Sequence, residues 1–119
     1  MVKIISADDI EFEKVDWGIT KELVAPRTLG SEKLKVKITE YLPGYVHQLH
    51  IHPGQEEVIY VLSGRGITQT PEGEREVGPG SVIFVPAGEP HTTWNLSETD
   101  PLRVIVVKSP PDDTEVRIE

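Results

Sequence analysis

The feature that most constrains the fold of this chain is a series of short apolar runs, most of them ended by glycine or proline. Ten Gly and ten Pro interrupt the 119 residues. The runs with a strand-like composition are residues 33–42, 46–52, 57–62, 67–70, 75–77, 81–85, 91–95 and 102–108. Short strands separated by turn signals every roughly 8 to 12 residues are typical of an antiparallel sandwich or barrel. No segment has the periodicity of an amphipathic helix, so we predict an all-β protein.

The alternation of residue types predicts which strands are half-buried and which lie in the core. In the stretch 33–42, Leu34, Val36 and Ile38 fall on one face and the intervening lysines on the other, as in a half-buried strand with its lysines in solvent. Residues 81–85 and 102–108 are apolar throughout most of their length and are predicted to be buried strands. Residues 71–74 predict a hairpin turn with proline at its second position. After Ser109 we expect a linker over 110–113, and the segment 114–119 can pair as an edge strand, including with a second subunit.

Length and charge limit the kind of protein that this chain can be. With 119 residues it is long enough for one domain with a hydrophobic core and too short for two. Its net charge of −8, with no basic stripe, argues against nucleic acid and anionic membranes as partners. No apolar run approaches the roughly 18 residues of a membrane span, and the first residues do not resemble a signal peptide, so we expect a cytoplasmic protein.

Four side chains have the spacing of a metal site. His50 and His52 are two apart on a predicted strand, so both imidazoles project to the same side. Glu57 opens the next strand after a Pro-Gly turn, and a hairpin there would return its carboxylate towards the two rings. His91 lies beyond a further strand. The chain has no cysteine, so a metal would have to bind to histidine and carboxylate, which favours Mn, Fe, Co, Ni or Zn. A His-x-His pair by itself is weak evidence, because surface histidine pairs are common.

The complete spacing is much more specific. The first string has the pattern G-x5-H-x-H-x4-E-x6-G, and the second has the pattern G-x5-P-x-G-x2-H-x3-N. The residues that fill these patterns are Gly44, His50, His52, Glu57 and Gly64, then Gly80, Pro86, Gly88, His91 and Asn95. These strings resemble the two conserved motifs of the cupin superfamily, and every specified position is filled. The chain is therefore identified as resembling a small single-domain cupin.

The resemblance implies a fold, a ligand set and an assembly. The implied fold is a double-stranded β-helix, a jelly-roll-like barrel, in one domain over 1–119 with its core at about 33–108, an N-terminal extension 1–30 and a tail 109–119. The implied ligands of one divalent ion are His50, His52, Glu57 and His91. Mn or Fe is favoured, with Zn, Ni or Co as alternatives. By the same resemblance we expect a homodimer, with the N-terminal segment and the tail as contributors.

Four other residues lie near these ligands in the sequence or in the motifs. Glu56 competes with Glu57, because the family allows a gap of three or four, but only Glu57 stands six residues before Gly64. On a strand, Glu57 would also share a face with the apolar residues 59 and 61. Gln48 shares the ligand face of its strand and is a candidate substrate-binding residue, although a satisfied polar group of the barrel explains it equally well. His47 falls on the opposite face and is not expected to be a ligand, and Asn95 is expected to be structural.

Function is much less determined than the fold, because cupins include enzymes of several kinds, storage proteins and sensing domains. We expect a metal-dependent enzyme acting on a small, oxygen-rich substrate such as an organic acid, a keto-enol or a sugar acid. Dioxygenase, decarboxylase, isomerase and lyase chemistry all remain open, and no general acid or base is identified. The alternatives are a non-catalytic small-molecule binding or sensing module and a protein in which the metal is structural.

Overall fold

The protein is built almost entirely of strands, as the sequence predicts. The computed structural model describes residues 1–44, 49–112 and 116–117. Within these ranges the helical element is a short 3-10 turn, η1 (Ala7–Asp9), and no helix is long and apolar enough to cross a membrane. The strands are β1 (Glu13–Val15), β2 (Gly18–Val24), β3 (Lys35–Tyr41), β4 (His50–Ile51), β5 (Glu56–Ser63), β6 (Gly66–Thr70), β7 (Gly73–Val77), β8 (Val82–Val85), β9 (Thr92–Asn95), β10 (Leu102–Ser109) and β11 (Val116–Arg117).

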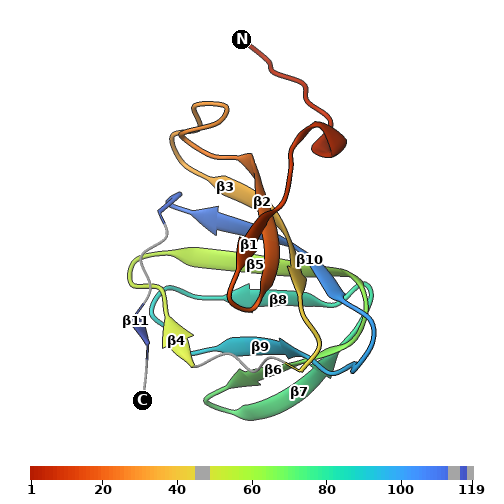
Figure 1. Ribbon diagram of the computed structural model, residues 1–119. Coiled ribbons are helices and arrows are strands. Elements are labelled where there is room, and N and C mark those ends of the chain that lie inside the picture. The colour runs from red at the N-terminus through yellow and green to blue at the C-terminus, as the bar shows by residue number, and fades with distance from the viewer. Residues whose placement is uncertain (45–48, 113–115, 118–119) are drawn as a thin grey trace.

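These strands form antiparallel sheets that face one another. One sheet has six strands in the order β1-β2-β3-β10-β5-β8, and another has three in the order β7-β6-β9. A two-stranded pair, β11-β4, is linked to the start of β9 by a bridge between His50 and His91. Figure 1 shows β3, β10, β5 and β8 running across the molecule, with β9, β6 and β7 below them. The neighbours in each sheet are mostly far apart in sequence, which is why the two motifs can meet.

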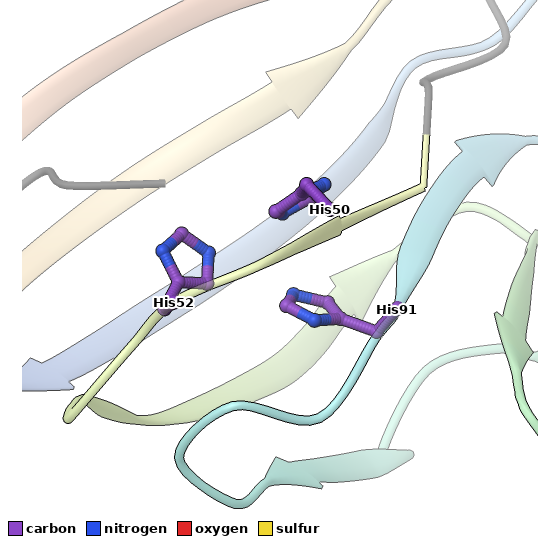
Figure 2. Close-up of side chains that lie close together, drawn as sticks. All are labelled: His50, His52 and His91. Carbon is purple, nitrogen blue, oxygen red and sulfur yellow. The ribbon is translucent and has the colours of Figure 1, made fainter. Parts of the chain in front are cut away.

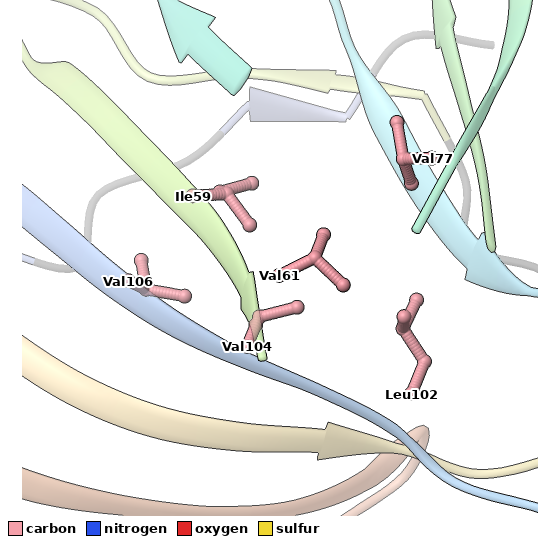
Figure 3. Packing of buried hydrophobic residues seen from close by; sticks show 6 residues of the cluster. All are labelled: Ile59, Val61, Val77, Leu102, Val104 and Val106. Carbon is pink, nitrogen blue, oxygen red and sulfur yellow. The ribbon is translucent and has the colours of Figure 1, made fainter. Parts of the chain in front are cut away.

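The hydrophobic core lies between the sheets and is dominated by β10 and β5. Val104 lies across from Val61 and Val106 across from Ile59 in the β10–β5 register, so these four side chains share the inner face. Together with two further apolar residues they form the buried cluster of Figure 3, whose members are Ile59, Val61, Val77, Leu102, Val104 and Val106. Each such side chain contributes about 1.5–3 kcal/mol by leaving water. The prediction of a core strand at 102–108 is confirmed.

The prediction that the lysines of 33–42 face solvent holds for Lys33, which is exposed, but is wrong for Lys35. Lys35 is only 4% exposed, whereas Leu34 is 41% exposed. In the β3–β10 register Thr39 lies across from Val104, so the face of β3 that carries Lys35 and Thr39 is the inner one. Lys35 can be buried because the Glu22 carboxylate lies 2.7 Å from its ammonium group. The alternation itself was correct, but the inner face of this strand is polar.

The apolar face of β3 is covered in part by the N-terminal region. Lys21 on β2 lies across from Ile38, and Ile38 is buried. The Lys21 ammonium group donates hydrogen bonds to the carbonyls of Ala7 and Ile10, at 2.7 and 3.3 Å, and lies 4.5 Å from the centroid of the Phe12 ring. The segment before β1 is therefore held against the outer side of β2, and β1 and β2 belong to the main sheet.

The prediction that 81–85 is a buried strand is also wrong. β8 pairs with β5 on one side only and is an edge of the six-stranded sheet. Its side chains alternate, so that Val85 is 4% exposed while Val82 and Phe84 are 64% and 56% exposed. An apolar run does not by itself show that both faces of a strand are covered, because neighbours in the fold decide that.

The described part of the C-terminal tail, which begins after residue 108, is held against its own chain by hydrogen bonds and strand pairing. The Gln55 amide nitrogen donates hydrogen bonds to the carbonyls of Pro110 and Asp112, at 2.7 and 2.6 Å, so the described part of the expected linker is anchored. Within the expected edge segment, Val116 and Arg117 pair with β4 of the same chain. The remaining residues of that segment, 114–115 and 118–119, lie outside the described residues, as does Asp113 of the linker.

The predicted turns are confirmed where strands must reverse direction. β6 and β7 form a hairpin that pairs Thr70 with Gly73, leaving Pro71 in the second position of the turn. Gly64 has φ +88°, and a Cβ atom there would lie 2.5 Å from the Pro101 carbonyl oxygen. Glycine is therefore required at position 64 both by the backbone conformation and by the close approach of the segment that contains Pro101.

Candidate metal centre

Three histidine rings converge inside the barrel. His50 and His52 come from β4 and the residue after it, and His91 immediately precedes β9. Figure 2 shows the three rings pointing towards one another. The ring centroids are 4.9 Å apart for His50 and His52, 4.4 Å for His50 and His91, and 5.3 Å for His52 and His91. One nitrogen from each ring lies within 4.8 Å of one nitrogen from each of the others.

Backbone hydrogen bonds hold the two motifs in this arrangement. The His50 amide donates to the His91 carbonyl at 3.1 Å, and the His91 amide donates to the His50 carbonyl at 2.9 Å. The Gly88 amide also donates to the His52 carbonyl at 3.2 Å. Backbone hydrogen bonds thus connect the segment between Pro86 and His91 to the strand that carries the other two histidines. This pairing brings the three histidines close together.

The Glu57 carboxylate contacts two of the three rings. Glu57 is 5% exposed and shares its inner face with Ile59 and Val61, as the strand parity predicts, whereas Glu56 is exposed. Its Oε1 atom lies 3.1 Å from His91 Nε2, and its Oε2 atom lies 3.9 Å from His52 Nε2. The carboxylate therefore closes one side of the cluster.

The surroundings of Glu57 keep it ionised. Burial by itself would raise the pKa of this carboxyl group. The hydrogen bond from His91 and the positive charges of Lys108 and the two histidines act in the opposite direction and prevail, so the pKa falls to about 2. An ionised carboxylate is the form that binds a metal.

The orientation of the His91 ring is fixed from both sides. Its Nδ1 atom lies 3.2 Å from the Glu89 carbonyl oxygen, and its Nε2 atom faces Glu57. Donation from Nδ1 to this carbonyl leaves Nε2 as the atom that can bind a metal. Second partners of this kind set the tautomer and the direction of metal-binding histidines in general.

The donor set fits a divalent transition metal. Two ligands that lie about 2.1 Å from one ion at a right angle are about 3.0 Å apart. The 3.1 Å between Glu57 Oε1 and His91 Nε2 is compatible with this value and is also the length of the hydrogen bond that joins the two atoms here. Three imidazoles and one carboxylate would form a borderline nitrogen and oxygen donor set suited to Mn, Fe, Co, Ni or Zn.

Of three further residues considered from the sequence, the structure describes Asn95 but not Gln48 or His47. Asn95 is structural, as expected: its amide nitrogen donates to the carbonyls of Tyr41 and Asp100 at 3.0 and 2.7 Å, and its side-chain oxygen accepts from the Ser97 amide at 2.9 Å. The substrate-binding candidate Gln48 and its neighbour His47 lie outside the described residues.

Two residues near the site were missed by the sequence analysis. The Lys108 ammonium group lies 3.7 Å from Glu57 Oε2 and is buried. Tyr41 packs beside Trp17, with ring centroids 5.1 Å apart, and burial together with the Glu57 charge raises the pKa of its hydroxyl group. The parity of 102–108, in which Lys108 shares a face with Val104 and Val106, was the signal that could have placed this lysine inside the barrel.

Comparisons with known proteins agree with the fold and the motifs. A family model described as Cupin domain matches residues 37–108. An uncharacterised protein of Methanocaldococcus jannaschii is 30% identical over 115 residues, which cover 89% of this chain and 91% of that protein. The oxalate-binding protein of Thermotoga maritima is 34% identical over 58 residues, which cover 49% of this chain and 48% of that protein. The matches to several other curated relatives cover about half the length of those proteins.

Among solved structures, the polyketide cyclase RemF from Streptomyces resistomycificus superimposes with a TM-score of 0.85. The superposition covers 100% of this chain and 87% of that one, at 26% sequence identity. A double-stranded β-helix protein from Klebsiella pneumoniae superimposes with a TM-score of 0.78 at 18% identity and covers 98% of this chain and 92% of that one. The predicted double-stranded β-helix is therefore confirmed.

Proposed function

This chain belongs to the cupin family, and on that premise we propose that His50, His52, Glu57 and His91 bind one divalent metal ion in a metal-dependent enzyme. The observation that carries the proposal is the convergence of three histidine rings on one point, with an ionised carboxylate against two of them. Mn or Fe is favoured, with Zn, Ni or Co as alternatives. The ion would act as a Lewis acid on the oxygen atoms of a bound substrate.

The residues of the chain have separable tasks in this proposal. Glu57 is a ligand and stays ionised, so it is not the group that exchanges protons with a substrate. His91 is held by the Glu89 carbonyl so that the same ring nitrogen always faces the ion. Glu57 shares the inner face of β5 with the buried residues Ile59 and Val61, and electrostatic interactions are stronger next to a hydrophobic core than in water.

The substrate class that we propose is a small, oxygen-rich molecule such as an organic acid, a keto-enol or a sugar acid. The similarity to the oxalate-binding protein of Thermotoga maritima supports the first of these. Oxygen atoms of such molecules are suitable donors for the open positions of the ion. Turnover of any compound from a panel of these classes by the metal-loaded protein would support an enzyme. Thermal stabilisation by a compound without turnover would favour a binding module instead.

The metal site is tested by the metal content of the purified protein, measured by mass spectrometry. We expect about one transition-metal ion per chain in the wild type and a loss of most of it in His52→Ala. His47→Ala is the matched control, because the sequence pattern places His47 outside the ligand set. A wild type that takes up none of the five metals on reconstitution would contradict the proposal, and so would equal metal loss in the two variants.

We also propose that the protein is a homodimer. The outer face of β5 and β8 supports this, because Tyr60 and Val82 lie across from one another there, next to Phe84, and all three are more than 40% exposed. Adjacent exposed apolar side chains of this size mark interaction surfaces. Light scattering should give twice the monomer mass for the wild type and a smaller mass for Phe84→Glu. A monomeric wild type would contradict the proposal.

A further inference from the structure

A cavity of about 560 Å³ lies between β7 and β8, which are edge strands of different sheets in the part of the chain that the structure describes. This volume is within the range of small-molecule sites. The β6–β7 hairpin lines the cavity on one side, and the start of β8 with the residue before it lines it on the other. None of the four candidate metal ligands is among the lining residues, so the cavity is distinct from the metal centre.

Arg75 is the basic residue of the cavity lining, and its side chain leaves β7 on the inner face. It stands two residues before Val77, which belongs to the buried core cluster, and side chains two apart on a strand share a face. In the hairpin register it lies across from Thr68, which is 5% exposed. The Arg75 guanidinium group makes no ion pair or hydrogen bond with any residue that the structure describes, whereas Arg65 pairs with Glu76 at 3.6 Å. The cavity therefore holds a positive charge that no described side chain neutralises by contact.

Other parts of the cavity wall offer apolar contacts and a hydroxyl group. Val77 is 7% exposed, and Ile83 on β8 packs against the same core cluster. The Ser81 Oγ atom accepts a hydrogen bond from the Gly78 amide at 3.0 Å, so the proton of this hydroxyl group remains for another acceptor. A ligand that fits these walls has an apolar body and a polar end that accepts hydrogen bonds.

Three glutamates also line the cavity and limit the charge of a ligand. Glu72 lies in the hairpin turn, and Glu74 and Glu76 flank Arg75 on β7, so by alternation they leave the strand on its other face. A carboxylate in contact with Arg75 is attracted at hydrogen-bond length, whereas glutamates on the other face act at greater distance through solvent, which screens them. A second carboxylate on the same ligand would find no second cation in the lining and would be repelled. The charges therefore favour a ligand with one carboxylate over a ligand with two.

We propose that this cavity is a second ligand site of the protein, for a small monocarboxylate with an apolar body. The carboxylate would pair with the Arg75 guanidinium group, whose planar donors match the two oxygens of a carboxylate. The apolar part would lie against Val77 and Ile83 and would leave water. Because no metal ligand lines the cavity, this site does not depend on the proposed metal centre.

The experiment titrates hexanoate into isotope-labelled protein and follows the backbone amide signals by NMR, which also locates the site. Hexanoate should shift the signals of residues 68–77 and 81–83, with a dissociation constant in the millimolar range for so small a ligand. Hexanamide has the same chain without the charge, and adipate carries a second carboxylate. Each of the two should bind at least about tenfold more weakly than hexanoate. Addition of a chelator should leave the hexanoate affinity unchanged.

Two variants at position 75 and one matched control test the role of the guanidinium group. Arg75→Met removes the charge and should weaken hexanoate binding about tenfold to a hundredfold, the loss expected for one charge-assisted hydrogen bond. Arg75→Lys keeps the charge and should restore part of that affinity. Arg65→Met is the control, because Arg65 is also exposed but does not line the cavity, and it should leave the affinity within about threefold. Both arginines are exposed, so each variant should fold like the wild type.

Several outcomes would overturn this second site and leave the proposed function untouched. Equal hexanoate affinity in wild type and Arg75→Met would do so, and so would equal binding of hexanamide and hexanoate. Shifts confined to the outer face of β5 and β8 around Phe84 would show adsorption to exposed apolar side chains instead. Loss of hexanoate binding on addition of the chelator would assign the binding to the metal centre and overturn the second site. The absence of any shift on titration of the wild type would overturn it as well.

Discussion

Glu57→Gln gives the sharpest test of the electrostatics of the site, because it removes a charge and keeps the size of the side chain. The pKa of Glu57 falls from an ordinary 4.5 to about 2 in the folded protein. At about 1.4 kcal/mol for each pKa unit, ionised Glu57 stabilises the metal-free protein by about 3 kcal/mol at pH 7. This magnitude applies because the group is buried, being 5% exposed, so solvent screens it little.

The sign of the pH dependence follows from the lowered pKa. A carboxyl group whose pKa is lower in the folded protein contributes its full stabilisation above the unfolded pKa, here 4.5. That stabilisation is lost as the pH falls from 4.5 through the folded value of about 2. Wild type and Glu57→Gln should therefore differ by about 3 kcal/mol at pH 7 and by only about 1.4 kcal/mol at pH 3.

Urea unfolding of the two proteins in the presence of a chelator measures this difference directly. Glu56→Gln is the matched control: the neighbouring carboxylate is exposed, and its loss should change the free energy of unfolding by less than about 0.5 kcal/mol. The reasoning would be refuted by a Glu57→Gln protein as stable as the wild type at pH 7. A difference that stays constant between pH 7 and pH 3 would refute it as well.

Three further predictions concern the scaffold. Burial would raise the pKa of Glu22, but hydrogen bonds from Lys35 and Arg27 outweigh it and lower the pKa. Glu22→Gln should therefore destabilise the protein at pH 7 and have a smaller effect below pH 4, which urea unfolding at the two pH values would show. Gly64→Ala should lower the free energy of unfolding by more than about 2 kcal/mol, because the added carbon would lie 2.5 Å from a carbonyl oxygen. Gly80 has a similar φ and open space around it, so Gly80→Ala should lower the free energy of unfolding by only about 1 kcal/mol in the same urea assay. Asn95→Ala removes a buried group with three hydrogen bonds and should lower the free energy of unfolding by about 2–3 kcal/mol without changing the metal content of the protein. An unchanged melting temperature would contradict the structural role of Asn95.

The all-β architecture and the candidate ligands could be predicted because both depend on local rules. Strand parity places His50 and His52 on one side and puts Glu57, not Glu56, on the inner face, and the structure agrees in each case. Turn chemistry located the β6–β7 hairpin, because proline and glycine restrict or extend the backbone wherever they occur. That His91 would meet the other histidines was implied by the resemblance of the two motifs to those of the cupin family, because no local rule shows how a distant segment returns.

By itself, then, the sequence predicted most of the strands from residue 33 onward, the two faces of each and the residues that share a face, whereas β1 and β2 were not predicted. Only the tertiary structure decided which face is inside and which strand lies next to which. Lys35 is buried because Glu22, on the strand beside it, supplies a carboxylate. Phe84 is exposed because its side chain lies on the outer face of β8, on the side opposite to the buried Val85. The contact of Lys108 with Glu57 joins residues 51 positions apart. Side-chain alternation is a property of one strand, whereas burial and ion pairing depend on neighbours that the chain brings together only by folding.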